Sequence, residues 1–211
     1  MKKEVIFIIC AHSDDEAIGM GGTIFKYLEE KKQLVKIIFS FGEQSHPHIK
    51  EEHTKKTRVK ETTRIEKRLG IKTYFLGVKD FKIKDEIHNS KLKENLSNLI
   101  KKYKPQKIFM TSLNDIHTDH RAVANITLDT CRKIKYPGEI YTYEVWAPKK
   151  ENNPYIYVDV SKYQKKKIEL IKEFVSQKIY TYPLLFLYFL RSRSYGKKIQ
   201  SKYAERFYRI Q

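Results

Sequence analysis

Residues 5–16, with the sequence VIFIICAHSDDE, pass directly from an apolar run into one histidine and three carboxylates. The run 5–11 is rich in β-branched and other apolar residues, which is typical of a parallel strand covered on both faces. In open parallel sheets, ligands bind beyond the carboxyl ends of the strands. The polar residues that follow this run are therefore expected at the edge of a sheet where a site forms.

Strand and helix patterns alternate along the rest of the chain. Further strands are predicted at 34–41, 72–76, 107–112, 139–145 and 155–160. Helices are predicted at 57–69, 90–103 and 119–133 and, after a glycine-containing turn at 19–22, from Thr23 to about Lys32. The alternation is typical of a Rossmann-like α/β fold, doubly wound, with a mostly parallel sheet and helices on both faces. With 211 residues and no repeat or linker, we expect a single domain over 1–211.

The charge of the chain is strongly basic, with 43 Lys and Arg against 25 Asp and Glu and a formal net charge of +18. The positive electrostatic potential of such a chain favours an anionic partner such as nucleic acid or an acidic membrane. The basic residues are scattered rather than gathered in one arm, so solvated faces are the preferred interpretation and no nucleic-acid partner is expected. The apolar stretch 182–190 is far too short to span a bilayer, but it is compatible with peripheral membrane contact.

The two cysteines and the N-terminal residues indicate the cellular compartment of the protein. Cys10 and Cys131 lie in an apolar run and a helical pattern, which is not the spacing of a disulfide framework or a zinc ribbon. The first residues do not have the pattern of a secretory signal. These features predict a cytoplasmic protein, and a homo-oligomer is compatible with them.

A second polar cluster, NDIHTDHR at 114–121, follows the predicted strand 107–112. Adjacent carboxylates raise one another's pKa unless a cation neutralises them, and a divalent metal ion would also use the histidines. Three protein ligands and a water form an open catalytic zinc site. His12, one aspartate and one histidine of the second cluster would supply that number. Zinc is the preferred ion, although Fe(II), Co(II) and Mn(II) also suit such ligands.

The ordered pair of motifs AHSDDE at 11–16 and HTDH at 117–120 resembles that of the LmbE-like, or PIG-L-like, zinc deacetylases. In that family AHPDDE follows the first strand and HxDH comes later. The resemblance extends over nearly the whole chain, through residues 19–23, 58–61, 69–70, 143–146, 158–161, 176–177 and 203–207. It implies an LmbE-like fold and hydrolysis of a linear amide bond in an N-acetylated amino sugar of the GlcNAc type, or in a glycoconjugate of one.

The resemblance also assigns roles to the two motifs. It implies that His12, Asp15 and His120 bind zinc, that Asp14 is the general base, and that His117 faces the reacting carbonyl. In this scheme the metal lowers the pKa of its water towards about 7. Asp14 accepts the proton of that water, and zinc together with a protonated His117 stabilises the oxyanion.

Three neighbours of this set receive weaker assignments. Asp119 is expected to orient His12 or His117, because catalytic and ligating imidazoles usually donate their other N–H to a carboxylate. Glu16 is interpreted as a cap of the following helix. Ser13 stands where the family usually has proline, and since proline supplies no reactive group, the metal site is expected to survive.

Candidate substrate contacts lie outside the motifs. Arg58 and Glu61 match family positions near the sugar, although their spacing also fits an intrahelical pair. Arg191 is a candidate contact for an anionic group of the substrate, with a basic surface as the alternative. Trp146 is interpreted as a core residue, and the three histidines of the loop 42–56 as solvated.

Two other classes of function stay open. A nucleic-acid-binding protein would use the net charge of +18, and its affinity would fall steeply with salt. A metal-binding scaffold without catalysis would keep the ligands alone. A binder does not need a His/Asp set, and a scaffold does not need Asp14 and His117, so the deacetylase is the preferred hypothesis.

Overall fold

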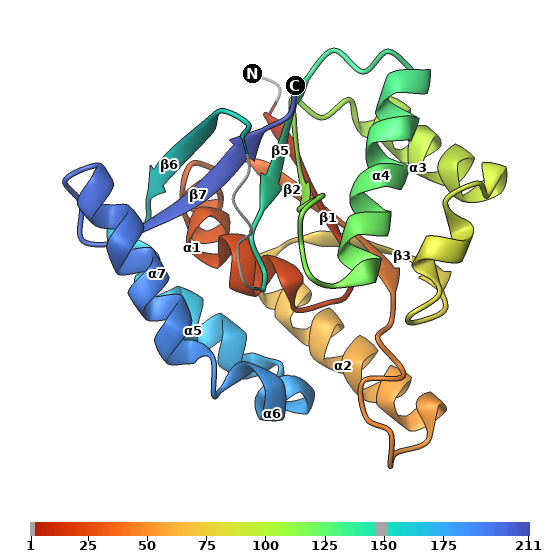
Figure 1. Ribbon diagram of the computed structural model, residues 1–211, viewed down its shortest axis with the longest axis horizontal. Helices are drawn as coiled ribbons and strands as arrows, with labels where there is room; N and C mark the ends of the chain where they lie inside the picture. Colours follow the sequence, from red (N-terminus) through yellow and green to blue (C-terminus); the bar gives the residue numbers. More distant parts are fainter. Residues whose placement is uncertain (1–2, 147–151) are drawn as a thin grey trace.

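The computed structural model describes residues 3–146 and 152–211, and its strands form one seven-stranded sheet (Figure 1). The strand order is β3-β2-β1-β4-β5-β7-β6. The first five strands are parallel, whereas β7 runs antiparallel to both β5 and β6. The strands are β1 (Val5–Cys10), β2 (Gln33–Ser40), β3 (Lys72–Val78), β4 (Lys107–Thr111), β5 (Glu139–Tyr143), β6 (Tyr155–Asp159) and β7 (Ala204–Arg209). The predicted mostly parallel α/β sheet is confirmed.

Helices cover both faces of the sheet, because β1 sends alternate side chains into two separate apolar cores. Phe7 and Ile9 pack in the core under α3 (Ser90–Tyr103) and α4 (Thr118–Lys133). Ile6 and Ile8 pack in the core under α1 (Asp15–Glu29), α2 (Glu51–Leu69), α5 (Gln164–Glu173) and α7 (Leu185–Lys198). The short elements are α6 (Lys178–Thr181), η1 (Ile83–Glu86), η2 (Ser161–Tyr163) and η3 (Val175–Gln177).

The chain leaves the neighbouring strands β1 and β4 toward opposite faces of the sheet. β1 continues into α1 on one face, and β4 continues into α4 on the other. This is the topological switch point at which doubly wound folds bind ligands. The two polar clusters follow β1 and β4, so the fold brings them to one place.

Helix α1 begins at Asp15, and the predicted glycine turn at 19–22 is wrong. The glycines lie inside the helix, which is kinked at Met20 (φ −144°, ψ 21°). Beyond the kink, the backbone N–H groups of Gly22 and Thr23 donate to the Glu205 carboxylate at 2.9 and 2.8 Å. A carboxylate at freed N–H groups acts like a helix cap. The small residues are needed for close packing rather than for a turn.

Gly19→Ala is expected to destabilise the protein. A Cβ at this position would lie 2.2 Å from Cδ2 of Tyr143, a buried ring whose hydroxyl donates to the Ile9 carbonyl at 2.9 Å. Overpacking of this kind costs about 1–3 kcal/mol, and the better helix propensity of alanine recovers at most ~1 kcal/mol. Urea unfolding should show a net loss. Asn98→Ala on the exposed face of α3 is the control, and equal unfolding midpoints for the two variants would contradict the packing argument.

Helices α5, α6 and α7 and strand β7 were not predicted, and helix α2 begins earlier than expected. Helix α2 begins at Glu51, six positions before the predicted start, and its buried residues are Thr54, Arg58, Thr62, Ile65 and Glu66. Strand β7, which was not predicted, buries the carboxylate of Glu205. Apolar periodicity cannot reveal the first turns of α2, because the inward positions of this helix are mostly polar.

Candidate active site

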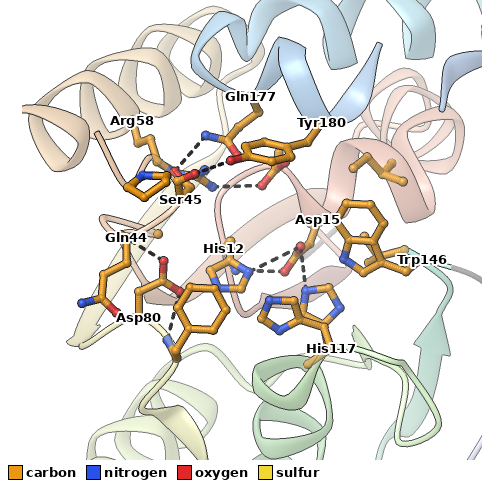
Figure 2. A pocket seen from close by; sticks show the side chains of 17 residues that line it. His12, Asp15, Gln44, Ser45, Arg58, Asp80, His117, Trp146, Gln177 and Tyr180 are labelled. Atoms are coloured by element: carbon orange, nitrogen blue, oxygen red, sulfur yellow. Dashed lines mark hydrogen bonds and ion pairs between the residues drawn. The ribbon is translucent and has the colours of Figure 1, made fainter. Parts of the chain in front are cut away.

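A pocket of about 320 Å³ opens at the carboxyl ends of β1 and β4 and is lined by both polar clusters (Figure 2). This volume is at the low end of small-molecule sites. Its wall combines titratable groups with apolar and aromatic surface. The lining residues are His12, Asp14, Asp15, Ile18, Gly42, Gln44, Ser45, Pro47, Arg58, Asp80, Phe81, His117, His120, Val145, Trp146, Gln177 and Tyr180.

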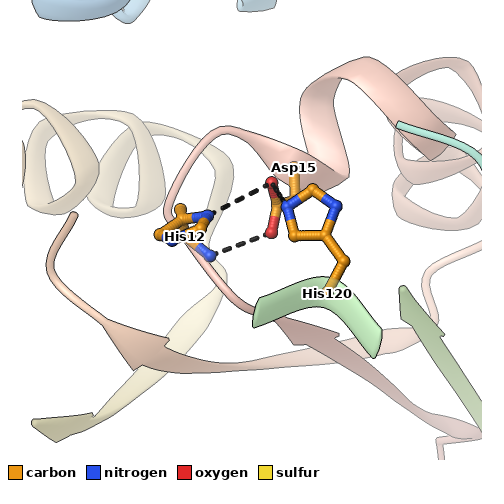
Figure 3. A group of neighbouring side chains, drawn as sticks. All are labelled: His12, Asp15 and His120. Carbon is orange, nitrogen blue, oxygen red and sulfur yellow. Dashed lines mark hydrogen bonds and ion pairs between the residues drawn. The ribbon is translucent and has the colours of Figure 1, made fainter. Parts of the chain in front are cut away.

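The structure brings together the three residues expected to bind a metal ion (Figure 3). Asp15 Oδ1 lies 3.2 Å from His120 Nε2 and 4.0 Å from His12 Nδ1. Asp15 Oδ2 accepts the backbone N–H groups of Ala11 and His12, both at 2.9 Å. These bonds hold the carboxylate so that its other oxygen is directed to the two imidazoles.

Two further carboxylates contact the outer nitrogens of these histidines. Asp80 Oδ1 lies 3.0 Å from His12 Nε2, and Asp115 Oδ2 lies 3.1 Å from His120 Nδ1. Metal-ligating histidines commonly donate their other N–H to such a partner, which fixes the ring and its tautomer. Neither aspartate was assigned from the sequence. Each follows a predicted strand at the same sheet edge, and this position was the signal that could have found them.

Asp119 lies beside His12, but it is not the closest carboxylate to that ring. Its Oδ2 is 3.7 Å from His12 Nε2 and accepts the backbone N–H of Phe81 at 2.8 Å. Its own backbone N–H donates to Nδ1 of His117 at 3.2 Å. Asp119 therefore contacts both imidazoles that it was expected to orient, one through its carboxylate and one through its backbone.

The electrostatics of this cluster favour a bound cation. Burial lowers the pKa of His12, but Asp119, Asp80 and Asp15 raise it to about 10. Burial likewise lowers the pKa of His120, and Asp15 and Asp115 raise it to about 9. Burial raises the pKa of Asp15, but the two histidines bring it well below its usual range. Buried carboxylates outnumber the histidines, so positive charge is stabilised there.

The donor set fits a metal ion. His120 Nε2 is fully buried and makes no hydrogen bond within the described chain, although Asp15 lies close to it. A metal ion would satisfy this nitrogen together with His12 and Asp15. Two imidazoles and one carboxylate form the set found in open zinc sites.

Asp115→Asn is expected to weaken metal affinity by about 10–100-fold, as outer carboxylate partners typically do. The amide keeps an oxygen for the backbone N–H of His117, which donates to Asp115 Oδ1 at 2.8 Å, but it removes the charge beside His120. Competition with a chromogenic chelator measures the affinity. Asp129→Asn on the surface of α4 is the matched control, and equal affinities in the two variants would exclude the outer role of Asp115.

Asp14 lies at the N-terminus of α1 and lines the pocket. Its Oδ1 accepts a hydrogen bond from Nη2 of Arg58 at 3.0 Å, and the Arg58 side chain is only 3 % exposed. A Cβ at Gly42, where φ is +66°, would lie 2.8 Å from the guanidinium, so this glycine leaves room for it. Ser13 Oγ is a distant second acceptor at 3.5 Å. Arg58 thus positions the proposed base.

His117 caps α4, and its Nδ1 accepts the N–H of Asp119. A neutral ring with this contact carries its proton on Nε2. Its ring centroid lies 4.7 Å from that of His120 and 5.6 Å from that of Phe81. Burial and the two neighbouring histidines, His12 and His120, lower the pKa of His117. A neutral His117 would therefore present an Nε2–H donor, and the protonated form expected from the resemblance stays a prediction.

Two candidate substrate contacts, Glu61 and Arg191, are not part of the described pocket lining. Glu61 does not pair with Arg58: it accepts the backbone N–H and the hydroxyl of Ser176 at 2.9 and 2.6 Å. Arg191 donates to the carbonyls of Glu144 and Trp146, both at 3.1 Å. Both residues hold segments that border the pocket, since Trp146 and the neighbour of Ser176 line it.

Glu16 is not a helix cap. Its buried carboxylate binds Lys36 Nζ at 2.6 Å, and the same ammonium binds Glu66 at 2.6 Å. Burial raises the pKa of Glu16 to about 7, against the opposing effect of Lys36. These three side chains join α1, β2 and α2, and buried charges require such pairing.

Several pocket residues were missed or misjudged from the sequence. Trp146 is half-buried and lines the pocket, so its assignment to the core is corrected. Tyr180 donates to the Ser45 carbonyl at 2.6 Å, and Gln177 donates to the Ser45 hydroxyl at 3.3 Å. His46 lies 2.7 Å from the Ser176 carbonyl and is not a solvated loop histidine, whereas His48 and His53 are exposed.

The fold and the site define an α/β protein with a candidate metal centre at the switch point of a doubly wound sheet. Residues 7–131 match the family described as PIG-L: GlcNAc-PI de-N-acetylase. The chain belongs to this family.

Solved structures with the same fold include two deacetylases and a hydratase. N,N'-diacetylchitobiose deacetylase from Pyrococcus horikoshii has a TM-score of 0.82 at 21 % identity, over 98 % of this chain and 84 % of that one. A deacetylase of the teicoplanin biosynthesis pathway has a TM-score of 0.79 at 12 % identity, over 97 % of both chains. GalB, the 4-carboxy-2-hydroxymuconate hydratase of Pseudomonas putida KT2440, has a TM-score of 0.80 at 18 % identity, over 99 % of this chain and 96 % of that one. The fold alone therefore does not specify the reaction.

Proposed function

We propose that this protein is a metal-dependent N-deacetylase that removes the acetyl group from a GlcNAc-type amino sugar or a conjugate of one. The observation that carries the proposal is a single pocket holding three convergent ligand atoms, with Asp14 and His117 in the same wall. Membership of a family described as de-N-acetylases supports it. The catalytic unit is proposed to be one domain over 1–211, since β1 and β7 belong to the same sheet. A cytoplasmic location stays a prediction.

His12, Asp15 and His120 would hold the ion. Zinc suits two imidazoles and a carboxylate, and Fe(II), Co(II) or Mn(II) are the alternatives. A divalent ion bound there supplies Lewis acidity, which polarises an amide carbonyl and lowers the pKa of water.

The remaining residues move protons and stabilise charge. Asp14, held by Arg58, accepts a proton from the attacking water as the new C–O bond forms. His117 donates its Nε2–H toward the carbonyl oxygen as negative charge develops on it. When the C–N bond breaks, Asp14 transfers the proton that it accepted from water to the departing nitrogen. The products are acetate and a free amine.

The pocket wall suits a sugar ring. Trp146, Phe81 and Tyr180 supply aromatic surface, and Gln44 and Ser45 supply polar atoms. Such a mixture matches a ring with apolar faces and a rim of hydroxyl groups. A volume of about 320 Å³ accommodates a small group, so a larger conjugate would extend out of the mouth.

Amine release from a panel of N-acetylglucosamine glycosides, nucleotide sugars and lipid-linked N-acetylglucosamine tests the proposal. The protein is stripped of metal and assayed with and without added zinc. Zinc-dependent release is expected, and the preferred substrate identifies the conjugate. A protein that binds one metal ion per chain but releases no amine from any member of the panel would contradict the proposal.

A further inference from the structure

The C-terminal helices carry apolar side chains on their outer surface. We call this surface the α6–α7 face, made of Ile179, Tyr182, Phe186, Leu187, Phe189 and Leu190, all exposed. Ile179 and Phe186 are each 66 % exposed and Leu187 is 56 % exposed. Surface helices of soluble proteins normally turn polar residues outward, and a contiguous apolar patch marks an interaction site.

Packing inside the chain does not account for these side chains. The inward side of α7 is formed by Tyr188, Ser192 and Gly196, which are buried and spaced four apart. A Cβ at Gly196 would meet the backbone of Lys202 at 2.8 Å, so this side lies tightly against the protein. The exposed apolar residues occupy the opposite side of the first turns of α7. In the described chain, Phe189 packs against the ring of Tyr203 at a centroid distance of 5.4 Å, and the other five residues of the face keep larger exposed fractions.

The charge of the same segment is one-sided. Residues 174–204 contain no aspartate or glutamate but six basic residues, Lys178, Arg191, Arg193, Lys197, Lys198 and Lys202. The last turns of α7 expose Arg193, Lys197 and Lys198, next to the apolar first turns. Apolar and aromatic side chains flanked by lysine and arginine are the pattern of helices that lie in the interface of an anionic bilayer. No described helix is long and apolar enough to cross a membrane.

The face adjoins the mouth of the pocket. Gln177 and Tyr180, from the segment that leads into α7, line the pocket, and Tyr180 donates to the carbonyl of Ser45, another lining residue (Figure 2). Ile179 lies between these two residues in sequence and points outward. A surface bound by the α6–α7 face would therefore lie beside the pocket mouth.

We propose that the α6–α7 face docks on an anionic lipid bilayer and brings the pocket to its headgroup region. A second copy of the chain fits less well, because two molecules with a formal charge of +18 repel each other. The docking proposal rests on the exposed apolar residues and the charge of the α6–α7 face, and it does not depend on the proposed function. Only its consequence, that amino sugars at the membrane surface come within reach of the site, rests on the proposed function.

Co-sedimentation of the full chain with phosphatidylcholine vesicles, with and without phosphatidylglycerol, tests the docking. Wild type is expected to bind the phosphatidylglycerol vesicles and to dissociate at high salt. Phe186→Ser with Leu187→Ser, and separately Lys197→Glu with Lys198→Glu, should each weaken binding by at least about tenfold. Matched controls are Tyr155→Ser with Ile156→Ser on the exposed edge of β6, and Lys101→Glu with Lys102→Glu on α3, which should bind as wild type.

Three results would overturn the docking. In the first, wild type does not bind phosphatidylglycerol vesicles. In the second, the control pairs lose as much vesicle binding as the test pairs. In the third, the Phe186 and Leu187 substitutions convert a wild-type oligomer into a monomer and leave vesicle binding unchanged. Amine release from a soluble N-acetylglucosamine glycoside is measured on the same variants and should be unchanged. Vesicle binding requires no turnover. A failure of the docking proposal is therefore seen in co-sedimentation, and a failure of the deacetylase proposal is seen in amine release.

Discussion

Asp14→Asn is expected to lower kcat by about 10²–10⁴-fold, the usual contribution of a positioned general base. The amide has nearly the size of the carboxylate and keeps an oxygen for Arg58, so the helix start and the pocket wall should be preserved. What it loses is the ability to accept a proton from water. Steady-state amine release gives kcat, and metal content is measured on the same preparation.

Metal retention is the second half of this prediction. Asp14 is not among the three residues whose ligand atoms converge, so Asp14→Asn should bind as much zinc as wild type. Asp129→Asn, an equal chemical change on the surface of α4, should leave both kcat and zinc unchanged. If Asp14→Asn had the same kcat as wild type, Asp14 would not be the general base.

His120→Ala should abolish both metal binding and turnover. The substitution removes one of three ligands and leaves Asp15 and Asp115 facing a cavity, with their charges no longer paired through the imidazole. The loss of affinity should exceed the about 10–100-fold typical of an outer-shell change. Thermal unfolding with and without zinc measures it, because a ligand that binds only the native state raises Tm.

The control for His120→Ala is His48→Ala, which removes an exposed histidine of the loop before α2. Wild type and His48→Ala should gain the same Tm with zinc, and His120→Ala should gain none. If zinc raised the Tm of His120→Ala as much as that of wild type, the ion would be bound elsewhere. Asp14→Asn should be inactive but keep zinc, whereas His120→Ala should be inactive and lose it. This pair of results distinguishes an enzyme from a metal-binding scaffold without catalysis.

Part of the fold could be predicted because its signals are local. The run 5–11 is apolar on both faces, and β1 is buried at every position. The helix 90–103 was predicted with the bounds that it has, because leucines recur at helical spacing and Pro105 follows it. Helix α2 started earlier than predicted because its inward positions carry Arg58 and Glu66, which a pattern of apolar residues cannot register, and the elements α5, α6, α7 and β7 were not predicted.

Some residues of the candidate site could likewise be predicted from the sequence, and others could be found only in the structure. The residues of AHSDDE are neighbours in sequence, so their crowding was visible, and the motif pair supplied His117 and His120. The partner of His12 was not visible, because Asp80 is 68 positions away and approaches only when β3 and β1 share a sheet. Arg58 likewise meets Asp14 across 44 positions through the packing of α2.

The sequence by itself indicated the alternation of strands and helices over residues 5–160, the two His/Asp clusters and the kinds of chemistry that those side chains can perform, since these depend on local composition and spacing. The tertiary structure alone decided which carboxylate holds each imidazole, that His117 accepts a backbone N–H at Nδ1, and that Trp146 lines the pocket. It also placed the apolar first turns of α7 at the surface beside the mouth. These contacts depend on how separate loops and helices meet over the sheet, and a linear pattern does not encode that geometry.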